Sequence, residues 1–242
     1  MPHGQPDYGM YSLAKTIYRL ADMAELAARL GSIVTFDRRG DVVWMDDFES
    51  GVEKWVISGS GTGYGCVSSA EKAKTGGWSA KLTTGQLINY LGQMRHYQSY
   101  PALSKIGFEV SFVIHLNLGG IRLELGLYTG TTFYVAMIDI CPTPPNLGYY
   151  DENFAYQTIA HDISIAAWDY LFHTAKLVAN FETGKYTRLI FDNYSYDLSS
   201  AKMYSSPSST SPNLFVTIIA TPSVNANEST YIDDVIITQN EP

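Results

Sequence analysis

Cysteine and long apolar runs are scarce in this sequence. Only Cys66 and Cys141 occur among its 242 residues, too few for the disulfide framework of a small secreted domain. The two thiols could pair, but the tendency of cysteine to be buried favours two free thiols. No stretch approaches the roughly 20 apolar residues of a membrane span, so we expect no transmembrane segment.

Basic residues are also few. Sixteen Lys and Arg stand against 24 Asp and Glu, which gives a formal net charge of −8. Such a surface repels phosphate backbones, so we expect no nucleic-acid partner. The opening Met1-Pro2-His3-Gly4 lacks the basic stretch and apolar run of a signal peptide. We therefore expect a virion-surface or cytoplasmic location, or an extracellular one reached by release or non-classical export.

The N-terminal part predicts a helix over residues 12–30. Ser12 is a suitable N-cap and Gly31 a suitable C-terminal stop. Residues 33–45 then predict a hairpin, so residues 1–40 form an arm, a helix and the start of a hairpin. We interpret this segment as an anchor, whose helix packs either on its own domain or on a neighbour. The heptad-like seam that would serve oligomerisation is Leu13, Ile17, Leu20, Ala24 and Ala27.

From residue 41 to residue 242 the pattern is nearly all β. In the run 106–116, Phe108 and Phe112 alternate with polar residues, which is typical of a strand with one buried face. Glycine-rich turns separate many such runs. The sequence therefore predicts a mainly β fold, an antiparallel two-sheet jelly-roll sandwich behind a short N-terminal α-helix. Three prolines predict a loop over Cys141–Asn146, and the serine-rich residues 205–212 predict an exposed loop.

Three stretches of the sandwich resemble known families. Residues 46–51, Asp-Asp-Phe-Glu-Ser-Gly, followed by Trp55, resemble the opening of jelly-roll carbohydrate-binding modules. Residues 231–237, Tyr-Ile-Asp-Asp-Val-Ile-Ile, are similar to the closing strand of those modules. Residues 172–193 look like the concanavalin A-like lectin and laminin G group. Both groups are two-sheet jelly rolls, so the resemblance implies the same architecture.

The same resemblance implies a structural calcium ion. In the carbohydrate-binding modules, the opening and closing strands lie close together and often share one. The matching positions here are Glu49 and Asp234, with Asp47 nearby. Calcium takes six to eight oxygen ligands, partly backbone carbonyls. No other cofactor is expected.

Catalytic motifs are missing. The chain has no Gly-x-Ser-x-Gly elbow, no Walker-type loop and no zinc spacing among its histidines. A glycoside hydrolase of the concanavalin A-like group needs two carboxylates beside the scissile bond. Its usual Glu-x-Asp-x-x-Glu run is absent, and Glu109 with Glu124, placed on neighbouring strands, is the pair that remains. We therefore expect a protein that is not an enzyme.

A sugar-binding face is easier to build from this sequence. Sugars stack on aromatic rings that have polar groups beside them. Tyrosines in expected loops add further rings: Tyr97, Tyr100, Tyr149, Tyr150 and Tyr156. The polar side of the strands between residues 106 and 128 supplies the predicted sugar-binding residues, which are Glu109, His115, Arg122, Glu124 and Tyr128.

The main functional prediction is a non-catalytic structural or display module on a homo-oligomeric, virion-like surface. An anchor segment before a lectin-like sandwich resembles the layout of phage capsid-decoration and tail-appendage proteins. The alternatives are a free-standing carbohydrate-binding lectin module and a glycoside hydrolase of concanavalin A-like fold. The expected partners are further copies of the chain, a larger assembly onto which it docks, and a glycan.

Overall fold

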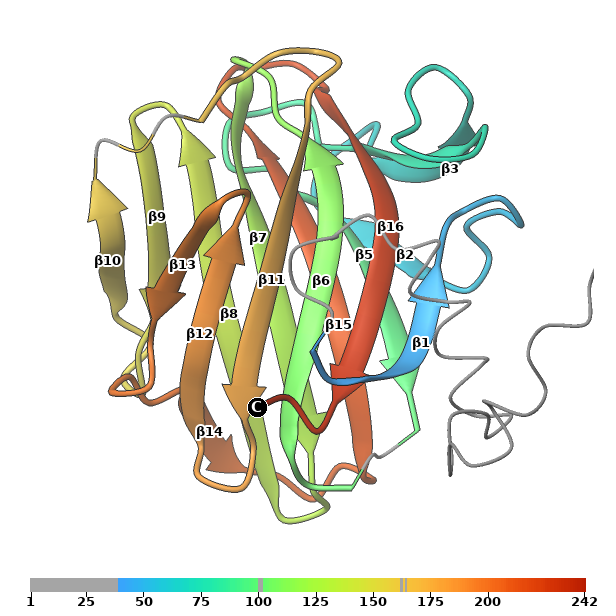
Figure 1. The fold of residues 1–242 in the computed structure, drawn as a ribbon. Coiled ribbons are helices and arrows are strands. Elements are labelled where there is room, and N and C mark those ends of the chain that lie inside the picture. Colours follow the sequence, from blue (N-terminus) through green and yellow to red (C-terminus); the bar gives the residue numbers. More distant parts are fainter. Residues whose placement is uncertain (1–38, 100–101, 162, 164) are drawn as a thin grey trace, which may run out of the picture.

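The computed structural model describes residues 39–99, 102–161, 163 and 165–242, which form a sandwich of two eight-stranded sheets (Figure 1). Every regular element in these ranges is a β-strand. None of them is therefore a helix able to cross a membrane. The predicted helix, with its seam from Leu13 to Ala27, lies outside the described residues. Its anchoring and oligomerisation roles stay predictions.

Sheet A, nearest the viewer in Figure 1, has the order β13-β12-β11-β6-β16-β4-β3, and β1 pairs separately with β16. All its neighbouring strands are antiparallel. The strands are β1 (Asp41–Asp46), β3 (Gly65–Ser69), β4 (Ser79–Thr83), β6 (Lys105–Val113), β11 (Phe172–Asn180), β12 (Lys185–Phe191), β13 (Tyr194–Asp197) and β16 (Ser229–Gln239).

Sheet B lies behind sheet A in that view and has the order β10-β9-β8-β7-β15-β5-β2, with β14 paired to β8. Its pairs are antiparallel too. The strands are β2 (Val56–Gly59), β5 (Gly92–Gln98), β7 (Leu118–Tyr128), β8 (Thr132–Pro142), β9 (Pro145–Tyr150), β10 (Tyr156–His161), β14 (Tyr204–Pro207) and β15 (Asn213–Pro222).

The core lies between the two sheets and follows the alternation of the sequence. Phe108 and Phe112 of β6 are fully buried, as are Leu123 and Leu125 of β7. Burying each such side chain stabilises the fold by roughly 1.5–3 kcal/mol relative to leaving it exposed. The alternate residues of each strand point out of the sandwich, so each sheet has an outer face that can carry a site.

The step from β6 to β7 changes sheets. Residues 114–117 carry the chain from the middle of sheet A to the middle of sheet B. The expectation that Glu109 and Glu124 lie on neighbouring strands was therefore wrong. Hydrogen-bonded pairing decides which strands are neighbours, and β6 pairs with β11 and β16 while β7 pairs with β8 and β15. The two carboxylates belong to opposite sheets.

Two expected loops are partly strand. The loop predicted over Cys141–Asn146 is confined to Thr143 and Pro144, because β8 runs to Pro142 and β9 starts at Pro145. Pro142 and Pro145 are paired with each other at the strand ends, where a missing N–H costs little. In the serine-rich stretch, β14 pairs with β8 as far as Pro207.

Both cysteines are free thiols. Cys66 lies on β3 of sheet A and Cys141 on β8 of sheet B. Burial raises the pKa of Cys66 to about 12 and that of Cys141 to about 11. Both thiols are therefore neutral and weakly nucleophilic near pH 7.

A buried ion cluster joins the C-terminal residues to sheet A. Lys176 Nζ lies 2.7 Å from Glu241 Oε1, and Arg188 Nη2 bonds the other oxygen of Glu241. Thr238 Oγ1 also donates to Glu241 Oε1, at 2.6 Å. Glu109 pairs in register with Lys176 on this face and is only 3% exposed. The cluster therefore secures the chain end against the middle of the sheet.

His173, at the start of β11, ties the preceding loop to the sheet. Its Nδ1 lies 2.6 Å from Asp192 Oδ2 and its Nε2 lies 3.0 Å from the carbonyl oxygen of Ala166. Both partners are acceptors, so a protonated ring donates to both. Burial lowers the pKa of His173, but the hydrogen bonds to Asp192 and Ala166 outweigh it, and the net pKa is above the ordinary value.

This arrangement predicts a pH-dependent contribution to stability. Because the folded-state pKa of His173 is raised, its contribution is present below about pH 6.5, the ordinary histidine pKa, and is lost as pH rises through the folded value. Urea unfolding across this range should show a fall in the free energy of unfolding that His173→Gln reduces. His96→Gln, at a half-buried ring stacked on Trp44, is the control and should keep the fall. Equal pH dependence in wild type and His173→Gln would contradict the assignment.

Candidate functional site

Eight aromatic side chains form a continuous strip over sheet B, here called the aromatic strip. From one end to the other, each ring centroid lies no more than 6.5 Å from the next. The strip crosses from β5 to β10, five strand spacings or about 24 Å. In order, its members are Tyr97, Phe215, Tyr128, Phe133, Tyr204, Phe154, Tyr150 and Tyr156.

Strand register places these rings together. Tyr128 of β7 stands opposite Phe133 of β8, with their ring centroids 4.6 Å apart. Phe215 of β15 stands between Gly126 of β7 and Tyr97 of β5. A side chain at Gly126 would begin 2.1 Å from Cζ of Phe215, so the missing side chain makes room for the ring. The phenylalanine ring thus lies over Gly126, next to Tyr97 at one end of the strip.

A tight polar group adjoins one end of the strip. Arg122 donates to both carboxylate oxygens of Asp139, at 2.7 and 3.0 Å. Its Nη2 also donates to the Tyr150 hydroxyl at 2.5 Å, and that hydroxyl donates to Asp139 Oδ2 at 3.1 Å. The Arg122 guanidinium lies 4.6 Å from the centroid of the Tyr150 ring. The bond with Asp139 holds the pKa of Arg122 above its ordinary value, so the arginine is a fixed cation.

A second arginine lies near the other end of the strip. Arg95 Nη2 is 3.5 Å from Glu124 Oε2, and Arg95 Nε donates to Thr217 Oγ1 at 2.8 Å. The same guanidinium lies 4.5 Å from the centroid of Phe215. Burial raises the pKa of Glu124, and the charges of Arg95 and Arg122 partly offset this effect. Charged groups and rings therefore share one surface.

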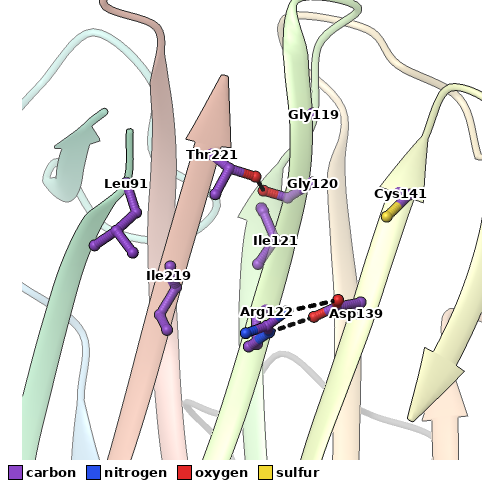
Figure 2. A pocket seen from close by; sticks show the side chains of 9 residues that line it. All are labelled: Leu91, Gly119, Gly120, Ile121, Arg122, Asp139, Cys141, Ile219 and Thr221. Atoms are coloured by element: carbon purple, nitrogen blue, oxygen red, sulfur yellow. Dashed lines mark hydrogen bonds and ion pairs between the residues drawn. The ribbon is translucent and has the colours of Figure 1, made fainter. Parts of the chain in front are cut away.

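A small pocket opens beside Arg122 (Figure 2). It has a volume of about 120 Å³, and Arg122 and Asp139 close one side of it. Gly119 and Gly120 leave space where β7 enters the sheet. The complete lining is Leu91, Gly119, Gly120, Ile121, Arg122, Asp139, Cys141, Ile219 and Thr221. The pocket has the size for a small polar substituent of a ligand that lies along the strip.

The structure brings together three of the five predicted sugar-binding residues. Arg122, Glu124 and Tyr128 alternate on β7 and share the outer face of sheet B. Glu109 is buried on sheet A, so its expected place on this face was wrong. His115 follows β6, and its Nε2 lies 3.0 Å from the carbonyl oxygen of Ser229, away from the strip. Strand crossover between sheets separates these two residues from the others.

Four rings of the strip were missed from the sequence: Phe133, Phe154, Tyr204 and Phe215. Phe215 stands in an almost wholly apolar run, where alternation does not reveal which face it occupies. Tyr204 belongs to a short strand beside the serine-rich stretch. Of the tyrosines that the sequence placed in loops, Tyr97, Tyr150 and Tyr156 belong to strands and to the strip.

The predicted calcium ligands lie around one loop, and burial together with the charges of Asp233 and Asp47 raises the pKa of Asp234 to about 7. Glu49 Oε1 accepts from the backbone N–H groups of Gly77 and Trp78, and Asp234 accepts from Thr75 Oγ1. Asp47 accepts from the N–H of Glu49. In the part of the chain that the structure describes, no three His, Cys, Asp or Glu side chains gather closely enough to hold a metal ion. The calcium ion stays a prediction.

The fold is a two-sheet jelly-roll sandwich, and it is similar to concanavalin A-like and galectin-like sandwiches. This confirms the architecture that the sequence resemblance implied. No protein-family model matches the chain. No curated protein sequence matches it either.

Three solved structures show the likeness. A Bacillus subtilis protein of unknown function with galectin-like fold has a TM-score of 0.55 and 10% identity, covering 83% of this chain and 97% of that one. An endo-β-1,4-glucuronan lyase from the fungus Trichoderma reesei has a TM-score of 0.54 and 11% identity, covering 82% and 96%. The cellulose-induced protein Cip1 has a TM-score of 0.53 and 15% identity, covering 81% and 96%. Such identities show a shared fold, and the fold includes at least one enzyme, so it does not decide whether this chain is catalytic.

Proposed function

We propose that this protein is a non-catalytic carbohydrate-binding protein whose ligand is a polysaccharide chain lying along the aromatic strip. The observation that carries the proposal is the strip itself, eight rings in continuous contact across one outer face, with two arginine–carboxylate pairs beside them. Tyr97 and Tyr156, at its two ends, are 49% and 42% exposed and Phe154 is 50% exposed, so these three rings are open to a ligand, while Phe215, only 2% exposed, packs between its neighbours. A ligand that spans about 24 Å is a chain of several sugar units.

The chemistry of the strip suits sugars. The apolar C–H face of a pyranose ring packs on an aromatic ring, and the hydroxyl groups at its edge need hydrogen-bonding partners. Arg95 and Arg122 supply donors, while Glu124 and Asp139 supply acceptors. Because each charge is already paired, the groups are held in place before the ligand binds, which lowers the entropic cost of binding.

The test is a binding measurement on variants at the ends of the strip. Tyr97→Ala and Tyr156→Ala should each weaken binding to polysaccharides about five- to tenfold in affinity gel electrophoresis, because each removes one stacking ring. The double variant should lose roughly the product of the two effects, since the rings are far apart. Tyr194→Ala is the matched control, because Tyr194 is an exposed tyrosine on the edge strand of sheet A. Unchanged binding in the double variant would refute the proposal.

A glycoside hydrolase is the second candidate, and one observation favours it. The raised pKa of Glu124 is a property of general acids, and Asp139 lies two residues along β8 from the residue opposite Glu124. The binding proposal expects no release of reducing ends from any polysaccharide that the wild type binds. Release that Glu124→Gln abolishes would replace it with the hydrolase.

A further inference from the structure

Two large aromatic residues stand outside the strip in the loop before β11. Trp168 is 70% exposed and Tyr170 is 78% exposed. Exposing so much apolar area in one loop is costly unless the surface serves binding. The loop lies at the end of the sandwich, where residues 114–117 also cross from β6 to β7.

The two loops enclose an open groove of about 450 Å³. This volume lies in the range of small-molecule sites. Asn117 Nδ2 donates to Glu228 Oε1 at 3.3 Å, which orients its amide at the groove. The lining combines apolar and polar groups and comprises His115, Leu116, Asn117, Ala167, Trp168 and Asp169.

The groove is held in shape by bonds at its base. The N–H of Leu171 donates to the carbonyl oxygen of Trp168, which closes a turn and turns the indole outward. His173 bonds the carbonyl oxygen of Ala166, two residues before Trp168. Lys72 Nζ lies 4.8 Å from the centroid of the Tyr170 ring and supports it from one side. These contacts hold the backbone of the loop that presents Trp168 and Tyr170.

Charge restricts the kind of ligand. Asp169 lines the groove, and Glu228 lies behind Asn117 with its Oε2 3.6 Å from His115 Nε2. Two carboxylates disfavour uronic acids, sulfated sugars and phosphates by like-charge repulsion. A neutral hexose fits, since its C–H face stacks on the indole and its hydroxyl groups meet the asparagine and aspartate.

We infer that the Trp168 groove is a second carbohydrate site, separate from the aromatic strip and selective for a neutral hexose unit. This inference extends the proposed function, but the residues that line the groove are not part of the aromatic strip. A strip on a sheet face suits the length of a polysaccharide chain, whereas a groove at the loop end suits one terminal or branching unit.

The experiment is an NMR titration of the full chain with neutral glucose and mannose oligosaccharides, and with a galacturonic acid oligosaccharide for comparison. The Trp168 indole N–H peak is assigned by its loss in Trp168→Ala. We expect the neutral oligosaccharides to shift this peak. The acidic oligosaccharide should leave the position of the peak unchanged. In calorimetry, Trp168→Ala should lower affinity at this site at least tenfold, and Trp78→Ala, another exposed tryptophan, should not.

The experiment distinguishes a failure of the strip proposal from a failure of the groove proposal. Tyr97→Ala should leave the shift of the Trp168 peak intact, so loss of polysaccharide binding with a preserved shift would mean that the groove binds independently. If none of the neutral oligosaccharides shifts the Trp168 peak at millimolar concentration, the groove proposal is overturned, whatever the strip binds. A shift produced equally by the acidic oligosaccharide would overturn its selectivity.

Discussion

Replacing Glu241 by alanine is expected to lower the free energy of unfolding by about 3–5 kcal/mol. The Glu241 side chain has no exposed surface and takes bonds from Lys176, Arg188 and Thr238. Lys176 is itself only 1% exposed. Removing the carboxylate takes a negative charge from between two buried cations. The cations then lose part of the favourable interaction that offsets the cost of burying them. Urea unfolding of the full chain, followed by tryptophan fluorescence, measures the change.

Two further variants separate charge from shape in this cluster. Glu241→Gln keeps the size of the side chain and removes its charge, so it should lose most of the same stability. Glu182→Ala removes an exposed glutamate in the turn between β11 and β12 and should change stability by no more than about 0.5 kcal/mol. A loss below about 1 kcal/mol for Glu241→Ala would show that the cluster does not stabilise the end of the chain.

Gly126→Val is expected to lower stability by about 1–3 kcal/mol and to weaken polysaccharide binding at least tenfold. A Cβ atom at this position would lie 2.1 Å from Cζ of Phe215, so the ring must leave its place. Phe215 contacts Tyr97, Tyr128 and Phe133, and its displacement would break the strip between Tyr97 and Tyr128. One added side chain therefore affects both packing and binding.

The matched control is Gly65→Val on β3. Nothing lies within 4 Å of a Cβ atom at Gly65, and valine suits a strand, so stability and binding should stay close to wild type. Thermal melts and affinity gel electrophoresis of the two variants give the comparison. If Gly126→Val bound polysaccharide as well as Gly65→Val, an intact strip could not be a requirement for binding.

Local pattern predicted the sandwich because alternation and glycine turns are local properties. Phe108 and Phe112 alternate with polar residues, and the structure buries them as expected. Strands with few apolar residues were missed. The strand β5 has the sequence Gly-Gln-Met-Arg-His-Tyr-Gln, and Met94 is its only fully buried side chain. One apolar residue does not produce an alternating pattern that predicts a strand.

Only the part of the site that lies on β7 was predicted as a shared face. Arg122, Glu124 and Tyr128 follow the two-residue period of β7, so their shared face could be inferred. The rest of the strip comes from strands that meet only through long-range pairing, such as Phe215 of β15. Pairing of β7 with β15 and not with β6 also separated Glu109 from Glu124. Register between distant segments is not a local property of the sequence.

The pairing of β1 with β16 has a consequence for how the sandwich can be rearranged. Asp41 lies beside Gln239, so the first and last strands of the described fold meet at one corner of sheet A (Figure 1). A short linker across that corner would permit circular permutation, with new ends opened in the exposed residues 209–212. Every strand pair would survive. Because the corner belongs to sheet A, attachment to a surface at that corner would leave the strip on sheet B facing the solvent.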